Sequence, residues 1–426
     1  MLTADRIACF WVFKKIIVTR TRLIFRIWQV GRAFWNFAMF PFSLISIVFL
    51  LAIQRAFPTR VMPMNTSRVG HLGIDVEYAL SDLGRRSSGT STRLIIVPYR
   101  IDLPTANSVL KKMWCECTTF LPAAIGVPLL WAIGHLGLSS RLMYLPPKRI
   151  AGRFHWGADP YGVTATGAAH LEFTRGQVES SENQLRQMGL DLSRPFVCLH
   201  VRDNQYHARH SNGLWNETHR WRNLPLGNFE KAVKLLTTKG FQVVRIGVYA
   251  SESLEEADEK DIFDYANNGF RSELLDVFLV SRCSFMISTS SGIDSLAQTF
   301  RKPLYNVGVI APSQLYIHRN VFSIVQRFHS EVEGRLLNLS ESCSLQKISD
   351  DSLSELRLRA VCNSPQEIAD LADEAAQRFL GDWLQVKEQS ELQTRFLSLL
   401  PSEFRRFQIR GGLGSKFLLE HSDWLH

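Results

Sequence analysis

The chain has 426 residues, 46% of them apolar, so it is long enough to form two domains with cores of their own. Its formal net charge of +9 does not indicate a nucleic-acid binder, because residues 1–68 hold ten basic side chains against one acidic side chain and the rest of the chain holds 39 of each. The seven cysteines are odd in number and scattered, which argues against a disulfide framework or a zinc site and favours a reducing compartment.

The N-terminal basic excess adjoins the longest charge-free apolar run of the sequence, residues 33–54. These 22 residues are long enough to cross a bilayer, and seven basic residues precede them. A cleaved signal peptide is disfavoured because no small-residue cleavage pattern follows. Residues 7–28 mix aromatic and basic side chains as an interfacial helix does.

Three arrangements remain open for this run: a span, a segment that enters one leaflet and returns, or an apolar helix packed on the body. A true span with the basic residues inside would export the body of the protein. We therefore expect residues 1–57 to form a membrane-associating segment that contacts an anionic membrane surface as a monotopic or re-entrant anchor. This places the protein on the cytoplasmic face of the inner membrane.

Residues 58–190 are predicted to form a first α/β lobe. A strand is expected at 59–64, a turn at 65–73, a helix at 74–84 and a second strand at 92–99. This order is typical of a parallel α/β unit. The apolar stretch 120–138 contains prolines and glycines and is expected to form a buried or interfacial helix rather than a membrane span.

Residues 191–345 are predicted to form a second lobe in which strands and helices alternate. Strands are expected at 195–201, 241–247, 284–289 and 302–308, with helices at 228–240, 271–283 and 292–300. Asn228 and Gly240 are expected to cap the first of these helices. Such alternation predicts a doubly wound parallel sheet that binds ligands at the carboxyl ends of its strands. Residues 346–426 are expected to form a helical tail, with one long helix at 364–389.

The strand at 195–201 ends in polar residues that a core strand does not need: His200, Arg202, Asp203 and Tyr206. An arginine at this place, with its planar set of donors, is suited to binding a diphosphate. The alternative is a structural ion pair with Asp203 or a neighbouring acid. His200 is either functional or a hydrogen-bonded core residue.

A second group of candidate residues is the serine-rich turn after the strand at 284–289: Thr289, Ser290, Ser291 and Gly292. Hydroxyl groups and free backbone N–H groups before a helix form an anion site. The alternative is an ordinary helix cap. Because the carboxyl ends of parallel strands meet at one edge of a sheet, this turn is expected to share a sheet edge with Arg202.

Two further candidates lie outside these strand ends. The long loop 203–228 offers Arg222 and Asn223, although it could also be a solvated surface loop. In the first lobe, His71 follows a strand, with Asp75 and Glu77 close behind it. An imidazole at this place could act as a general base.

The segments "VCLHVRDNQYH" and "CSFMISTSSG" resemble the paired HVRD-x-x-Y and T-S-S-G elements of a bacterial family of predicted glycosyltransferases. More remotely, His-x-Arg at 200–202 and the serine-rich turn are similar to the donor-site motifs of fucosyltransferase-type enzymes, which have the two-lobed GT-B fold. The resemblance implies two Rossmann-like lobes, with the nucleotide sugar on the second lobe and its diphosphate held by Arg202. Asp203 stands where a second arginine often follows, which leaves the donor sugar and nucleotide open.

Together these observations predict a membrane-associated glycosyltransferase. It would move a sugar from a nucleotide-sugar co-substrate to a glycan or lipid-linked acceptor in surface polysaccharide synthesis. No D-x-D motif stands out, so we expect no metal, no other cofactor and no nucleic-acid partner. Two alternatives stay open: a pyruvyl or phosphoryl transferase on the same scaffold, and a non-catalytic membrane-tethered glycan-binding scaffold.

Overall fold

The computed structural model describes residues 30–86, 91–99, 104–145, 149–150, 153–154, 159, 162–202, 223–248, 252–254, 260–310, 315, 320–345, 350–401 and 411–426. The chain divides into two compact units. Unit 1 comprises Met1–Asn65, Ser87–Leu103 and Thr118–Leu145, and unit 2 comprises Thr66–Arg86, Pro104–Cys117 and Pro146–His426. Both units contain a parallel sheet, so the predicted α/β class is confirmed, whereas the lobe boundaries expected at residues 58, 191 and 346 stay predictions.

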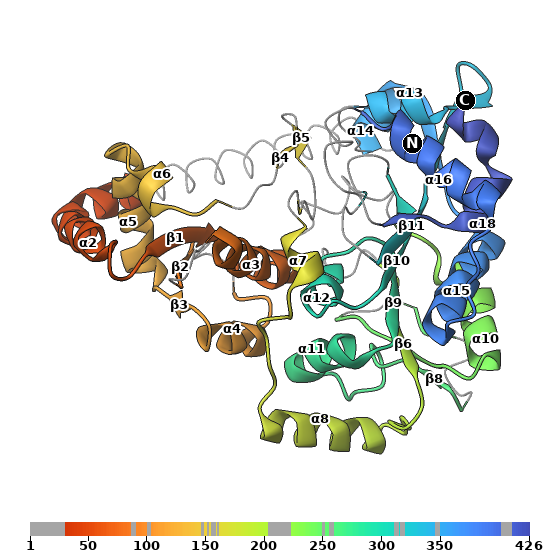
Figure 1. Cartoon of the computed structure of the whole chain (residues 1–426), viewed down its shortest axis with the longest axis horizontal. Coiled ribbons are helices and arrows are strands. Elements are labelled where there is room, and N and C mark those ends of the chain that lie inside the picture. The colour runs from red at the N-terminus through yellow and green to blue at the C-terminus, as the bar shows by residue number, and fades with distance from the viewer. Residues whose placement is uncertain are drawn as a thin grey trace, which may run out of the picture. The chain divides into compact units, whose positions relative to one another are not determined.

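Unit 1 is built on three parallel strands in the order β1-β2-β3 (Figure 1). Its strands are β1 (Thr59–Met64), β2 (Arg93–Pro98) and β3 (Thr119–Phe120), and its helices are α2 (Phe40–Ile53), α5 (Ala123–His135) and α6 (Ser139–Leu142). The strands expected at 59–64 and 92–99 are confirmed. The apolar stretch 120–138 forms α5 after a short strand, and α5 packs on β2 and α2 in the core of this unit.

Helix α2 is apolar on every side, but unit 1 covers only one of its faces. Ile47 and Leu50 are buried in a core shared with β1, β2 and α5. On its other faces, Phe42 is 64% exposed, Ile45 68% and Phe49 61%. A helix that is hydrophobic all round is normally covered all round, so this face is unusual for a water-exposed surface.

No single helix among the described residues is long and apolar enough to cross a bilayer. Two consecutive helices, Val30–Ala38 and Phe40–Ile53, reach the required length and composition only as a pair, and they are bent by 55° at the break between them. The basic aromatic segment expected at 7–28 lies outside the described residues.

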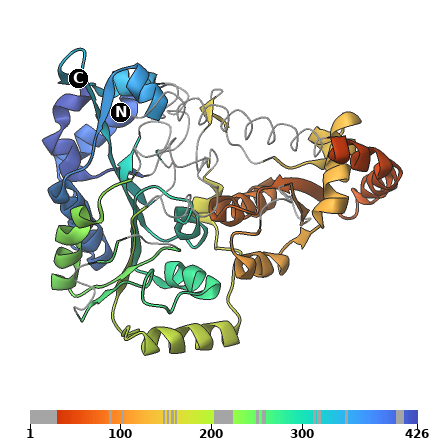
Figure 2. The ribbon, with the colours of Figure 1, turned by 180° about the vertical axis from the view of Figure 1, so that it is seen from behind.

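Unit 2 is built on seven parallel strands in the order β15-β11-β10-β9-β6-β7-β8. The strands are β6 (Phe196–His200), β7 (Gln242–Arg245), β8 (Ile262–Phe263), β9 (Phe285–Ser288), β10 (Leu304–Val309), β11 (Val321–Val325) and β15 (Gly412–Leu413). Helices α10 (Glu230–Thr238) and α15 (Pro365–Leu380) cover one face of this sheet, while α11 (Glu273–Arg282) and α12 (Asp294–Thr299) cover the other (Figures 1 and 2). The predicted doubly wound sheet is confirmed.

The strand order reverses at β6. From β6 the chain runs outward through β7 and β8, and it then returns through α11 to place β9 on the other side of β6. In an open α/β sheet, the crevice for ligands lies at the carboxyl ends of the strands at such a reversal. The carboxyl ends of β6 and β9 are therefore the first place to look for a site.

Two predicted helices differ from their expected limits. The helix expected at 364–389 ends at Gly381, whose left-handed conformation (φ 85°) stops α15, and a separate helix α16 begins at Lys387. The helix expected from Asn228 begins as a 3-10 turn, η3 (Leu226–Phe229), before α10. Asn228 does not cap it, because its amide nitrogen donates to the carbonyl of Asn363 instead. Gly240 (φ 87°) follows α10, as expected.

The remaining elements are shorter or lie at the edges of unit 2. The helices are η1 (His71–Asp75), α3 (Val76–Arg86), α4 (Ser108–Cys115), α7 (Val163–Thr166), α8 (Arg175–Gln187), α13 (Leu339–Ser344), α14 (Asp350–Glu355), α16 (Lys387–Leu399), α18 (Ser415–Glu420) and η4 (Ser422–Leu425). The strands are β4 (Arg149–Ile150), β5 (Arg153–Phe154), β12 (Arg327–Ser330), β13 (Arg335–Leu336) and β14 (Leu358–Val361).

The packing of α5 on β2 gives a direct test of the unit 1 core. A Cβ at Gly126 would lie 2.6 Å from a methyl carbon of buried Val97, whereas a Cβ at exposed Gly134 in the same helix would meet nothing within 4 Å. Gly126→Ala should lower the free energy of unfolding by about 1–3 kcal/mol through overpacking. Gly134→Ala should raise it by about 0.5–1 kcal/mol through helix propensity. Urea denaturation followed by circular dichroism measures both, and equal effects would contradict the packing.

Candidate functional site

Strands β6 and β9 pair in parallel, with His200 opposite Ser288. The residues after each strand are joined by two further hydrogen bonds. The backbone N–H of Arg202 donates to Thr289 Oγ1 at 2.8 Å, and the N–H of Thr289 donates to the carbonyl of His200 at 3.2 Å. Arg202 and the serine-rich turn therefore share one edge of the sheet, as the sequence predicts, and the pairing of β6 with β9 places them side by side.

Arg202 is a basic residue at this edge, and it is only 8% exposed. Burying a guanidinium is costly unless an opposite charge and hydrogen-bond acceptors accompany it. A charge that is withdrawn from water at the end of a strand interacts more strongly with a bound anion than a surface charge does. This environment suits the diphosphate-binding role expected of Arg202.

The carboxylate of Asp294 supports the serine-rich turn by hydrogen bonds, and this residue was not among those predicted from the sequence. Ser288 Oγ donates to Asp294 Oδ1 at 2.5 Å, and the backbone N–H of Ser291 donates to Asp294 Oδ2 at 3.0 Å. Asp294 is fully buried at the first position of α12. The N–H of Ser291, expected to face an anion, thus binds an internal carboxylate, so anion binding here falls to the side chains.

The outer part of the turn remains accessible. Ser290 is buried and adopts a left-handed backbone conformation (φ 52°), which is uncommon for a residue other than glycine. Ser291 is half-buried and Gly292 is exposed. The chain turns at this strained residue, and the two positions after it are partly accessible to solvent.

His200 extends the same group of polar contacts. Its Nδ1 lies 3.5 Å from Ser288 Oγ, which in turn donates to Asp294. The histidine is half-buried at the end of β6. It is therefore close enough to the turn to support it, and this contact is long for a strong hydrogen bond.

His71 belongs to the same compact unit as the sheet. The stretch expected to be a turn at 65–73 becomes helical at its end, where His71 begins the π-helical turn η1. His71 Nδ1 lies 3.0 Å from Asp75 Oδ2. The backbone before it reaches the serine-rich turn, because a Cβ at Gly70 would lie 3.2 Å from Gly292 Cα.

Three predicted site residues, Asp203, Tyr206 and Arg222, lie outside the described residues. Asn223 is described and is half-buried where the chain re-enters the core at Leu224. Their roles stay predictions. The described residues bring together Arg202, His200, the serine-rich turn and the segment that carries His71.

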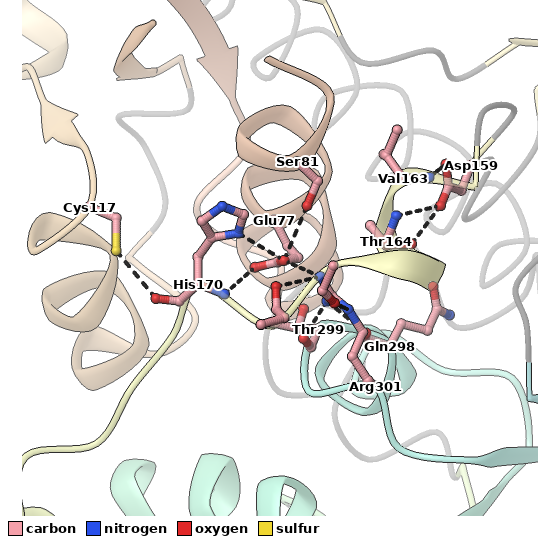
Figure 3. A network of polar contacts seen from close by, with 12 residues as sticks. Glu77, Ser81, Cys117, Asp159, Val163, Thr164, His170, Gln298, Thr299 and Arg301 are labelled. Carbon is pink, nitrogen blue, oxygen red and sulfur yellow. Dashed lines mark hydrogen bonds and ion pairs between the residues drawn. The ribbon is translucent and has the colours of Figure 1, made fainter. Parts of the chain in front are cut away.

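A second polar cluster of unit 2 centres on Glu77, the other acid that follows His71 in sequence (Figure 3). Glu77 Oε1 accepts from Arg301 at 2.6 Å, from His170 Nδ1 at 3.0 Å and from Ser81 Oγ at 3.3 Å. The backbone N–H of His170 donates to Glu77 Oε2 at 3.2 Å. Both carboxylate oxygens of this fully buried acid are thus engaged by the protein, which indicates a structural role rather than a catalytic one.

The electrostatics of the cluster agree with that role. Burial on its own would raise the pKa of Glu77, but the hydrogen bond from His170 and the positive charge of Arg301 outweigh it, so the pKa lies below its ordinary value. The pKa of the neighbouring Cys117 thiol is raised, first by burial and then by the charge of Glu77. That thiol therefore stays protonated and unreactive at neutral pH.

Within the described ranges, no group of three or more His, Cys, Asp or Glu side chains is arranged to hold a metal ion. Two described acids beside the candidate site have protein partners: Asp294 contacts the serine-rich turn and Asp75 contacts His71.

The sequence matches no protein-family model, and no curated protein matches it. Several solved structures resemble the chain at low sequence identity. The Escherichia coli ADP-heptose LPS heptosyltransferase II is 13% identical, with 75% of this chain and 99% of that chain covered and a TM-score of 0.43. A family 9 glycosyltransferase from Veillonella parvula is 14% identical, with 63% and 85% covered and a TM-score of 0.40.

The iron-containing dodecameric heptosyltransferase TibC, solved with ADP-D-β-D-heptose, is 12% identical, with 76% of this chain and 77% of that chain covered and a TM-score of 0.35. All three TM-scores lie below 0.5, so the function proposed below rests on the residues of this chain.

The Glu77 cluster predicts a pH-dependent contribution to stability. Glu77→Gln should lower the free energy of unfolding at pH 7 by about 3 kcal/mol. This value is at the low end of the cost of breaking a buried ion pair, because one partner, His170, is partly exposed to solvent. Since the folded pKa of Glu77 is depressed, its contribution is complete above the ordinary value of 4.5 and is lost as the pH falls below it. Urea denaturation between pH 7 and pH 3 measures the difference from wild type, which should shrink on acidification.

A matched control is the surface pair of Arg175 and Glu179 on α8, where Nε and Oε1 lie 2.7 Å apart. Glu179→Gln should change the free energy of unfolding by less than about 1 kcal/mol, because both side chains are solvated. A loss for Glu77→Gln no larger than for Glu179→Gln would contradict a structural role for the cluster.

Proposed function

We propose that the protein is a glycosyltransferase that moves a sugar from a nucleoside-diphosphate sugar to a hydroxyl group of a glycan or a lipid-linked acceptor. The observation that carries this function is the junction of Arg202 with the serine-rich turn, made by the pairing of β6 with β9. The junction lies where the strand order reverses, the usual position of a nucleotide in an open parallel sheet.

Sugar transfer requires that the negative charge on the leaving diphosphate is stabilised. As the bond between the anomeric carbon and the phosphate oxygen breaks, negative charge grows on the diphosphate. Arg202 supplies a permanent charge with two parallel donors, and the hydroxyl groups of Ser290 and Ser291 supply further donors. We propose that these side chains, rather than a metal ion, neutralise the leaving group.

The proposed role of Arg202 predicts a loss of nucleotide affinity without unfolding. Arg202→Lys keeps the charge but removes the paired donors, so the dissociation constant for the preferred nucleoside diphosphate should rise about 10-fold to 100-fold. Isothermal titration of the purified full-length chain with UDP, GDP and ADP measures the constant. The expectation fails if Arg202→Lys binds the nucleotide as tightly as wild type, or if none of the nucleotides binds wild type.

Arg245 provides a matched control. It is a second buried arginine at the end of a neighbouring strand, and its charge is paired with Asp264 at 3.2 Å. Arg245→Lys should lower the melting temperature and leave nucleotide affinity unchanged. Equal loss of affinity in both variants would mean that the effect of Arg202→Lys is a general loss of stability.

We further propose that α2 holds the protein on the cytoplasmic face of the inner membrane, where a lipid-linked acceptor would be found. The exposed face of α2, formed by Phe42, Ile45, Phe49 and Val48, is the support for this placement. The bend before α2 and the ten basic residues of positions 1–68 suit a helix that enters one leaflet of an anionic membrane.

The apolar face of α2 predicts a measurable membrane affinity. Replacing Ile45 and Phe49 together by glutamate should lower binding to phosphatidylglycerol vesicles at least 10-fold, because two large apolar side chains no longer enter the bilayer. Vesicle co-sedimentation measures the binding. Val332→Glu, at an apolar residue that is 67% exposed in unit 2, is the control and should bind as wild type does. Unchanged binding of the double variant would contradict the anchor.

A further inference from the structure

The π-helical turn η1 brings an imidazole and a carboxylate into direct contact. His71 and Asp75 are four residues apart, and Nδ1 of the first lies 3.0 Å from Oδ2 of the second. A π turn is wider than an α turn and is frequent at functional sites. The side chain of His71 is 19% exposed and that of Asp75 is 14% exposed, so the pair is sheltered but not fully buried.

The backbone of η1 is held against α12 and the serine-rich turn, all within unit 2. A Cβ at Gly70 would lie 3.2 Å from Gly292 Cα, and a Cβ at Gly73 would lie 2.6 Å from Ser295 Oγ. Ser295 Oγ also donates to the carbonyl of Val69 at 3.3 Å. The absence of a Cβ at both glycines allows this close packing of η1 against the turn and α12.

The other side of η1 is held by a buried indole. Trp114 Nε1 donates to the carbonyl of Leu72 at 2.7 Å, and Trp114 is fully buried in α4. The π turn is therefore fixed on two sides, by α12 and by α4. A rigid support of this kind is what a precisely oriented catalytic side chain needs.

We propose that Asp75 is a positioning residue for His71: its carboxylate holds the proton on Nδ1, so that Nε2 is the nitrogen that accepts the proton of the acceptor hydroxyl. This role rests on the proposed glycosyl transfer and deepens it. A neutral imidazole has one protonated and one basic nitrogen, and the hydrogen bond of one nitrogen decides which is which. The carboxylate also stabilises the imidazolium that forms when Nε2 takes up the proton.

The step balances without any co-reactant beyond the proposed substrates. The acceptor oxygen forms a bond to the anomeric carbon of the donor sugar as it loses its proton to His71 Nε2. The bond between that carbon and the diphosphate oxygen breaks, and the diphosphate leaves with the electron pair. The proton on the imidazolium then passes to water when the products leave.

The alternative is a purely structural role, since acid and histidine four residues apart on a helix also form simple stabilising pairs. The two roles differ in what happens to the ring. A structural pair affects stability alone, whereas a positioning residue sets the tautomer of His71 and the rate of the chemical step.

The test is Asp75→Asn in the full-length chain. An asparagine amide can donate to Nδ1 and so place the ring proton on Nε2, where it blocks proton uptake. We expect kcat to fall about 100-fold, the size of a general-base contribution, with nucleotide affinity and acceptor KM unchanged. Nitrogen NMR of histidine-labelled protein should show His71 protonated at Nδ1 in wild type and at Nε2 in the variant.

Two further variants complete the experiment. Asp75→Glu keeps a carboxylate and should recover about 10-fold of the lost rate. Asp82→Asn removes a buried carboxylate of α3 that pairs with Arg85 at 2.9 Å and Arg86 at 2.6 Å, so it should lower stability only. Its kcat and its His71 ring signals should match wild type.

The outcomes separate the two levels of the inference. If wild type transfers sugar but Asp75→Asn keeps its kcat, or keeps the proton on Nδ1, Asp75 is not a positioning residue. If wild type binds no nucleoside diphosphate and transfers no sugar, the glycosyl transfer itself is wrong, whatever the ring signals show.

Discussion

The parallel pairing of β6 with β9 is the interaction on which the candidate site depends. Because His200 lies opposite Ser288 and both strands run in the same direction, the residues that follow them leave the sheet at one edge. The hydrogen bond from the N–H of Arg202 to Thr289 then joins the two strand ends. The position of the arginine is thus set by two central strands of the unit 2 sheet.

Much of this arrangement could be predicted from the sequence. The strand at 59–64 has the expected limits, and β6, β7, β9 and β10 begin and end within two residues of prediction. Short apolar runs between helices are a strong signal for buried parallel strands. A shared edge for Arg202 and the serine-rich turn followed from that pattern alone, because the carboxyl ends of parallel strands meet at one edge. The direct pairing of β6 with β9 is a finding of the structure.

What could not be predicted depends on contacts that only the fold creates. An acid at the start of a helix, such as Asp294, is common. The sequence does not show that its carboxylate accepts hydrogen bonds from both the Ser288 hydroxyl and the Ser291 backbone N–H. The helical periodicity after residue 364 continues through Gly381, so the break there depends on one backbone conformation. Glu77 and Asp75 look alike in sequence, yet one serves a buried cluster and the other contacts His71.

The close approach of η1 to the serine-rich turn has an evolutionary consequence. A Cβ at position 70 would lie 3.2 Å from backbone, which moves aside less easily than a flexible side chain, so glycine should be favoured there among chains that keep this histidine. Position 73 meets a side chain instead, so a larger residue there demands a smaller one at 295, and these two positions should change together. Glycine-histidine followed by aspartate four residues later, combined with a distant serine-serine-glycine, is thus a pattern by which descendants of the same ancestor can be recognised.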